Sequence, residues 1–123
     1  MKKLIVIPFL LLIYSCNQKP NCEAFLRIDR DSECLKIVKK EQFITAATLG
    51  FKGVNPYTNE KCECNDNNRW WYLYRDEINI GDTIIKRKGE LTFNIHKRDT
   101  IISHEWECDG NTYYPDGSIK EKL

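Results

Sequence analysis

Cys62-Glu63-Cys64 is the segment of this sequence whose residue types and spacing point most directly to chemistry. Side chains two positions apart on an extended segment lie on the same side, so both thiols would share one face. With Cys108 and a histidine they could supply four zinc ligands, but structural zinc sites use C-x₂₋₄-C spacing and the chain has no second pair. We therefore predict a disulfide, or a free thiol, and neither a metal nor another cofactor.

An aromatic segment, Trp70-Trp71-Tyr72-Leu73-Tyr74, follows at once. On a strand, Trp70, Tyr72 and Tyr74 would share one side, and Trp71 and Leu73 the other. Tryptophan and tyrosine dominate the energetic centres of protein interfaces, and their flat rings also stack on sugars. We therefore take Trp70, Tyr72 and Tyr74 as the candidate binding surface for a protein or a glycan, with coverage of this face by helices as the alternative.

The two histidines, His96 and His104, do not complete a known catalytic motif. His104-Glu105 begins like H-E-x-x-H, but Cys108 stands where the second histidine belongs. We expect His104 to be a hydrogen-bonded residue at the edge of the core and His96 to be solvated. The sequence contains no P-loop, G-x-S-x-G or G-x-G-x-x-G, so it predicts no catalytic residue and no enzyme.

Acidic residues alternate at Asp29, Asp31 and Glu33, like the start of an EF-hand loop. The sixth position of that loop would be Cys34 in place of glycine, and the twelfth would be Lys40 in place of glutamate. The pattern therefore predicts an acidic turn that caps a helix.

The N-terminal segment determines the compartment in which these groups act. Lys2 and Lys3 precede residues 4–14, an uncharged apolar run of 11 residues. As a helix the run would be roughly 16 Å long, whereas crossing a bilayer core takes about 20 residues. A short run behind a positive charge is typical of a signal peptide.

The end of this run, Ile13-Tyr14-Ser15-Cys16, resembles the lipobox of bacterial lipoproteins, which has an aliphatic residue at −3, a small one at −1 and then cysteine. Tyr14 departs from the pattern, which usually has a smaller residue there. The resemblance implies a signal peptide, residues 1–15, that is removed, and Cys16 as the lipidated N-terminus, carrying diacylglyceryl and an acyl chain such as palmitate. Residues 16–21 would then be the lipidated cysteine and a polar tether.

The same resemblance implies a location in the cell envelope, with membrane lipid as a partner through N-terminal acylation. Asn17, in place of an aspartate, favours the outer membrane, on its periplasmic or surface face, in a host that has one. A diacylated protein of this kind is stably anchored.

Lipidation of Cys16 changes the count of cysteines available for bridges from six to five. An odd number allows at most two intramolecular bridges and leaves one thiol. One arrangement pairs Cys22 with Cys34, and Cys108 with one of the two cysteines of the C-x-C segment; the other joins Cys34 to the C-x-C segment, and we prefer the first. The candidates are Cys22, Cys34, Cys62, Cys64 and Cys108.

Composition limits the partners of the mature chain. Cleavage before Cys16 leaves 108 residues, which suits one small domain over residues 22–123. It also leaves 17 basic and 18 acidic residues, a formal charge of −1. A near-neutral domain has no electrostatic footprint for nucleic acid, so we exclude that partner class.

The pattern of residues 21–68 predicts helices followed by a loop. Asn21 can cap a helix that begins at Cys22, and Asp31 or Ser32 can cap a second helix over residues 33–40. Residues 43–49 fit a helix or a strand. Residues 50–68 are dense in Gly, Pro, Asn and Asp and predict a loop.

The remainder predicts antiparallel strands. If Arg98-Asp99 forms the turn between residues 91–96 and 100–108, Ile95 faces Ile102, Phe93 faces His104 and Leu91 faces Trp106, so every apolar residue points inward. The basic segments 86–88 and 97–98 would be solvated turns. The expected fold class is α+β, with one or two short N-terminal helices followed by an antiparallel β-meander of four to five strands.

These observations favour a membrane-anchored envelope lipoprotein that acts as a non-catalytic binding or interaction module. An immunity-type inhibitor of a secreted toxin is the main alternative, and a small enzyme or thiol-redox protein is a further one.

Overall fold

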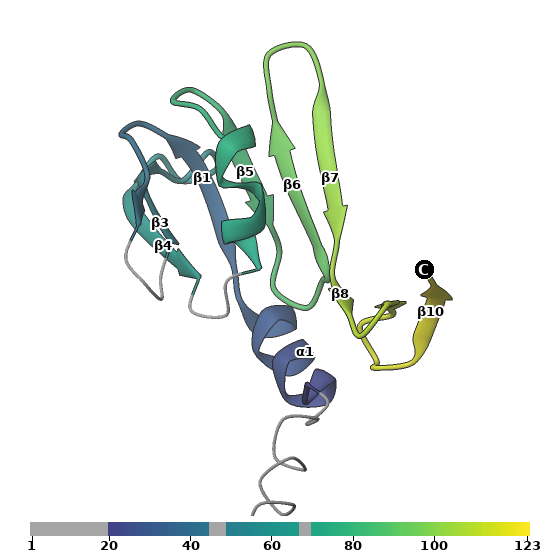
Figure 1. The fold of residues 1–123 in the computed structure, drawn as a ribbon. Coiled ribbons are helices and arrows are strands. Elements are labelled where there is room, and N and C mark those ends of the chain that lie inside the picture. Colours follow the sequence, from purple (N-terminus) through teal and green to yellow (C-terminus); the bar gives the residue numbers. More distant parts are fainter. Residues whose placement is uncertain (1–19, 45–48, 67–69) are drawn as a thin grey trace, which may run out of the picture.

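The computed structural model describes residues 20–44, 49–66 and 70–123, and this part of the chain is mostly β-structure (Figure 1). It contains two helices, α1 (Cys22–Asp31) and the 3₁₀-helix η2 (Trp71–Glu77), with one sheet of seven strands and one of three, both antiparallel. The predicted α+β fold with a meander of four to five strands is therefore wrong. The signal peptide predicted over residues 1–15 and the lipidated Cys16 lie outside the described residues.

The larger sheet has the order β2-β3-β1-β5-β6-β7, and β4 pairs with the other edge of β3. Its strands are β1 (Cys34–Val38), β2 (Phe43–Ile44), β3 (Leu49–Val54), β4 (Lys61–Asp66), β5 (Thr83–Lys86), β6 (Thr92–His96) and β7 (Ile101–Glu105). The smaller sheet, at the C-terminal end of the chain, consists of β8 (Glu107–Cys108), β9 (Asn111–Tyr113) and β10 (Ile119–Lys122).

β1 occupies most of the segment predicted as a second helix. Cys34, Lys36 and Val38 are buried and alternate with half-buried residues, which is the period of a strand. The strand pairs with β5 on one side, where Leu35 faces Ile85, and with β3 on the other. These pairings outweigh the capping and charge signals of the isolated segment, because local helix propensity amounts to only a few tenths of a kcal/mol per residue.

β1 and β2 both pair with β3, on either side of a bend at residues 39–42. Ile37 faces Val54 before the bend, and Phe43 faces Gly50 after it. β3 continues through a turn into β4, so most of the loop predicted over residues 50–68 is a hairpin. Its glycines lie in β3, where Gly53 approaches the Ile37 carbonyl too closely to accommodate a Cβ.

The N-terminus of α1 confirms the predicted cap, because Asn21 Oδ1 accepts a hydrogen bond of 3.2 Å from the Ala24 amide. Leu26 and Asp29 face the interior, and Ser32 ends the helix. α1 therefore begins at Cys22, as the sequence predicts.

The β6–β7 hairpin also has the predicted register. Phe93 faces His104 and Ile95 faces Ile102, and the Trp106 amide donates to the Leu91 carbonyl over 2.9 Å. The register is determined by the alternation of apolar and polar residues, since a shift of one residue would expose Phe93 and Ile95, both fully buried.

η2 lies over the core face of the larger sheet, in front of β5 in Figure 1. Trp71 is 1% exposed and stacks on Phe93 of β6 with 5.5 Å between ring centroids. A helical turn allows Trp70 and Trp71, which are consecutive, to be buried together. A strand would have directed them to opposite faces.

Candidate functional site

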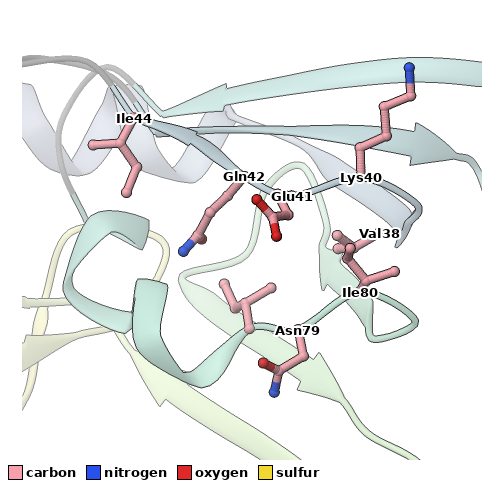
Figure 2. Close-up of a pocket in the computed structure, with 8 residues that line it drawn as sticks. Val38, Lys40, Glu41, Gln42, Ile44, Asn79 and Ile80 are labelled. Carbon is pink, nitrogen blue, oxygen red and sulfur yellow. The ribbon is translucent and has the colours of Figure 1, made fainter.

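A cleft of about 480 Å³ lies between the β1–β2 bend and the segment that follows η2 (Figure 2). Its aliphatic lining comes from both sides, and Ile44 and Ile80 remain 48% and 58% exposed. In Figure 2 the Lys40 ammonium points away from the cleft. The lining residues are Val38, Lys40, Glu41, Gln42, Ile44, Ile78, Asn79 and Ile80.

Hydrogen bonds hold the walls of the cleft in place. On one side, Gln42 Nε2 donates to the Arg75 carbonyl of η2 over 3.0 Å. On the other side, Asp82 Oδ2 accepts from the Asn79 amide at 2.8 Å and from Lys97 Nζ at 2.5 Å. The backbone of Asp82 also accepts from the Val38 amide over 2.8 Å. Both walls are therefore positioned without a ligand.

The lining of the cleft combines four aliphatic residues with four polar or charged ones. It contains the Glu41 carboxylate and the Lys40 amine, and no hydroxyl, thiol or imidazole side chain. Gln42 Oε1 is buried and accepts no hydrogen bond within the described part of the chain. A cleft that offers apolar side chains beside polar groups has the elements of a small binding site.

The aromatic surface predicted from the sequence is not an exposed patch. Trp70 is 5% exposed, and Tyr72 and Tyr74 are half-buried, because η2 is a helix packed on the core. On η2, Leu73 is the large apolar residue that projects to solvent, at 68% exposure. The alternation expected of a strand does not exist here, and of the three predicted contact residues Tyr72 and Tyr74 remain partly exposed while Trp70 is buried.

His104 joins η2 to β7. Its Nε2 lies 2.6 Å from Glu77 Oε2, and its ring stacks on Tyr74 with 3.6 Å between centroids and 5° between planes. Burial raises the pKa of the Tyr74 hydroxyl above its ordinary value. His104 is thus a hydrogen-bonded residue at the boundary of the core, as predicted.

Two disulfides connect distant parts of the chain. One joins Cys22 of α1 to Cys108 of β8, and the other joins Cys34 of β1 to Cys64 of β4. The preferred arrangement, with Cys22 bound to Cys34 and Cys108 bound to the C-x-C segment, is therefore wrong in both bridges, and the alternative link from Cys34 to the C-x-C segment is observed. β3 lies between β1 and β4 in the sheet. The Cys34–Cys64 disulfide, with 5.6 Å between the Cα atoms, therefore requires the sheet to curl around its core face so that β1 and β4 approach each other.

Of the alternating acidic residues, Asp29 and Asp31 lie in the last turn of α1, and Asp29 is buried in the core. Asp29 is 4% exposed, and its Oδ2 accepts a hydrogen bond of 2.7 Å from Trp106 Nε1. Across residues 20–44, 49–66 and 70–123, no group of three or more His, Cys, Asp or Glu side chains is arranged to hold a metal ion.

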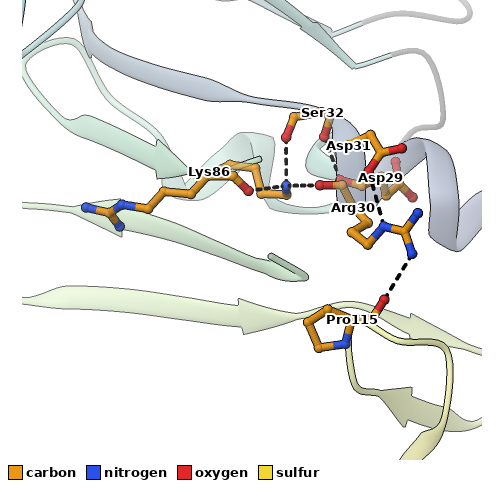
Figure 3. Close-up of polar contacts among 7 residues, drawn as sticks. Asp29, Arg30, Asp31, Ser32, Lys86 and Pro115 are labelled. Atoms are coloured by element: carbon orange, nitrogen blue, oxygen red, sulfur yellow. Dashed lines mark hydrogen bonds and ion pairs between the residues drawn. The ribbon is translucent and has the colours of Figure 1, made fainter. Parts of the chain in front are cut away.

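Lys86 belongs to a basic segment predicted as a solvated turn, yet it is fully buried. Its ammonium donates to three carbonyl oxygens, those of Arg30 at 3.1 Å, Ser32 at 2.7 Å and Arg87 at 2.7 Å (Figure 3). Two of these acceptors lie at the C-terminus of α1, where a cation is favoured by the helix dipole. Burial nevertheless lowers the pKa of Lys86 to about 8, against the attraction of Asp29, Glu90, Asp31 and Glu33.

The lowered pKa of Lys86 predicts that the free energy of unfolding rises with pH above about 8. Between that value and the pKa of about 10.4 of an exposed lysine, the unfolded chain holds more protons than the folded one. The slope contributed by one such group is at most about 1.4 kcal/mol per pH unit. Urea unfolding of the wild type and of Lys86→Met between pH 7.5 and 9.5 measures it.

The difference between the two proteins isolates Lys86, because every other group titrates in both. We expect the free energy of unfolding of the wild type, relative to that of Lys86→Met, to increase as the pH rises. Parallel profiles would show that Lys86 keeps its ordinary pKa. The range stops at pH 9.5 because Lys86 contributes no further slope above the pKa of about 10.4 of an exposed lysine.

The cleft residues were not identifiable from the sequence. The lining comes from residues 38–44 and 78–80, which only the tertiary structure brings together. A weak sequence signal of the cleft was Ile78-x-Ile80 before the Gly81-Asp82 turn, an apolar pair of which Ile80 is exposed in the structure.

Comparison with protein-family models, curated proteins and solved structures gives no match to this chain. Neither helix of the described ranges is long and apolar enough to cross a membrane.

Proposed function

We propose that this chain is a non-catalytic binding module of the cell envelope and that the cleft beside the β1–β2 bend is its ligand site. The observation that carries the proposal is an aliphatic cleft, fixed on both sides by hydrogen bonds, in which Ile44 and Ile80 remain about half exposed. Exposed apolar side chains around a preformed hollow lose unfavourable contact with water when a ligand covers them.

The ligand class that fits this lining is a polypeptide segment carrying an aliphatic side chain. Val38, Ile44, Ile78 and Ile80 would surround that side chain. The Glu41 carboxylate, at the same cleft, can accept a backbone N–H of the ligand. The cleft replaces the aromatic segment as the proposed contact surface.

The lipid anchor at Cys16 is part of this proposal and rests on the resemblance of residues 13–16 to a lipobox. α1 begins at Cys22, six residues further along. Six extended residues reach at most about 21 Å, so an anchored domain would stay close to the membrane surface. Its partner would then be a protein exposed at, or delivered to, that surface.

Replacing Ile80 with glutamate is expected to weaken binding by about 2 kcal/mol, roughly 30-fold, because a charge would enter the apolar cleft. Ile101→Glu is the matched control, since Ile101 is 57% exposed on β7, outside the cleft. Recovery of the crosslinked partner from native envelopes, with both variants folded by circular dichroism, measures the effect.

Equal recovery by the wild type and Ile80→Glu would reject the cleft as the ligand site. Equal loss in both variants would reject it too, because Ile101 lies elsewhere. Recovery of a secreted toxin through the cleft would identify the module as an inhibitor of the immunity type.

A further inference from the structure

Three exposed apolar side chains, Phe25, Ile28 and Leu73, form a patch where α1 meets η2, here called the α1–η2 patch. Phe25 and Ile28 are neighbours three residues apart on α1 and are 43% and 55% exposed, and Leu73 of η2 is 68% exposed. Phe25 and Leu73 line the same hollow, of about 190 Å³. Large apolar side chains that gather on a surface in this way mark a contact site for a protein or a membrane.

The surroundings of the patch favour an apolar occupant over a charged one. The described residues that line the hollow include two further aromatic side chains, Trp70 and Trp106, and two acidic ones, but no basic residue. Of the acidic pair, Asp29 is buried and accepts a hydrogen bond from Trp106 Nε1, whereas Glu107 is exposed. An anionic partner would therefore find no cation in this lining.

The position of the patch along the chain decides between a protein and a membrane. Phe25 lies in the first turn of α1, three residues after Cys22, and the tether predicted over residues 16–21 ends just before that helix. Six extended residues reach at most about 21 Å, so a lipid on Cys16 would keep the first turn of α1 within that distance of the bilayer.

The size of the patch points the same way. A stable protein–protein interface takes about 20–30 residues a side, many more than the three of the α1–η2 patch. A tether makes contact with the membrane an intramolecular event, for which a small apolar surface is sufficient.

We propose that the α1–η2 patch seats the domain on the bilayer that holds the Cys16 lipid, with Phe25, Ile28 and Leu73 in the interface between headgroups and acyl chains. The inference rests on the lipid anchor of the proposed function and goes beyond it, because it fixes the orientation of the domain. Burial of apolar surface is what holds an interfacial helix at this depth. The patch is distinct from the ligand cleft, since the two linings share no residue.

The native tryptophans report on this contact. The chain has three, and Trp70 and Trp106 line the hollow of the patch. The mature, lipidated chain is bound to phosphatidylcholine vesicles with or without bromine on the acyl chains, since bromine quenches tryptophan fluorescence only at close range. We expect quenching of the wild type, and a reduction of at least about 2-fold in Ile28→Glu/Leu73→Glu, because charged side chains oppose insertion.

A matched control places the same two changes elsewhere on the surface. Ile80→Glu/Ile101→Glu alters two isoleucines that are 58% and 57% exposed and lie outside the patch, and it should be quenched like the wild type. All four substituted side chains are more than half exposed, so both variants should fold, which circular dichroism checks. Both should also sediment with the vesicles, because each keeps the lipid on Cys16.

The outcomes separate the seating surface from the anchor. A wild-type chain that sediments with the vesicles but is not quenched would overturn the seating surface and leave the anchor standing. Equal quenching of the wild type and Ile28→Glu/Leu73→Glu would overturn the seating surface as well. Absence of the wild type from the sedimented vesicles would overturn the anchor, and this proposal with it.

Discussion

Trp71→Ala is expected to reduce the free energy of unfolding by about 3–5 kcal/mol, the range for removal of a large buried aromatic side chain. Trp71 is 1% exposed and stacks on Phe93, which is itself fully buried. Its loss would leave a cavity between η2 and the sheet, because the disulfides and the His104–Glu77 contact limit collapse of the surrounding structure. Urea denaturation monitored by far-UV circular dichroism measures the change.

Leu73→Ala on the same helix is the control for Trp71→Ala. Leu73 is 68% exposed, so its removal should change the stability by less than about 0.5 kcal/mol. A comparable loss in both variants would mean that η2 is not packed through Trp71. This contrast also separates a core role for the aromatic segment from the contact role predicted by its sequence alone.

Removal of the Cys22–Cys108 bridge is expected to lower the free energy of unfolding by about 4.5 kcal/mol in the chain-entropy model. The bridge closes a loop over a sequence separation of 86 residues. The bridge attaches α1, the first described helix, to β8, near the other end of the domain. Cys22→Ser/Cys108→Ser removes it with little disturbance of the core, since both residues are only half-buried. The midpoint of urea unfolding, compared with the non-reduced wild type, measures the loss.

Cys62→Ser is the control for the bridge variant, because Cys62 forms no disulfide and is exposed. It should unfold within about 0.5 kcal/mol of the wild type. A bridge variant as stable as Cys62→Ser would contradict the observed pairing. Non-reducing peptide mapping provides a second test, and a peptide that links Cys22 to Cys34 would contradict it as well.

The proposed ligand cleft lies beside one structural feature, the bend at residues 39–42. Lys40 lines the cleft, but in Figure 2 its ammonium points away from it. β1 and β2 both pair with β3, and between their registers the Lys39 amide still donates to the Lys52 carbonyl over 3.0 Å. A short irregularity in one edge of the sheet thus accompanies the concave surface on which the proposal depends.

The sequence by itself determined those features whose cause is local. The β6–β7 register follows from alternation over two adjacent strands and one turn, and the start of α1 follows from the Asn21 cap and the residues after it. In both cases the partners are close along the chain, so few alternatives compete. The envelope location is also inferred from a local segment, residues 2–16, and it stays a prediction.

Only the tertiary structure decided the features whose partners are far apart in the chain. Residues 33–40 have a helical pattern, but the pairing of β1 with β5 and β3 makes them a strand. Cys34 could be matched with Cys64 only after β1 and β4 were known to meet. Lys86 looked like a turn residue until the end of α1 was placed against β5. Burial and long-range pairing outweigh local preference at each of these positions, and a sequence does not display them before the chain has folded.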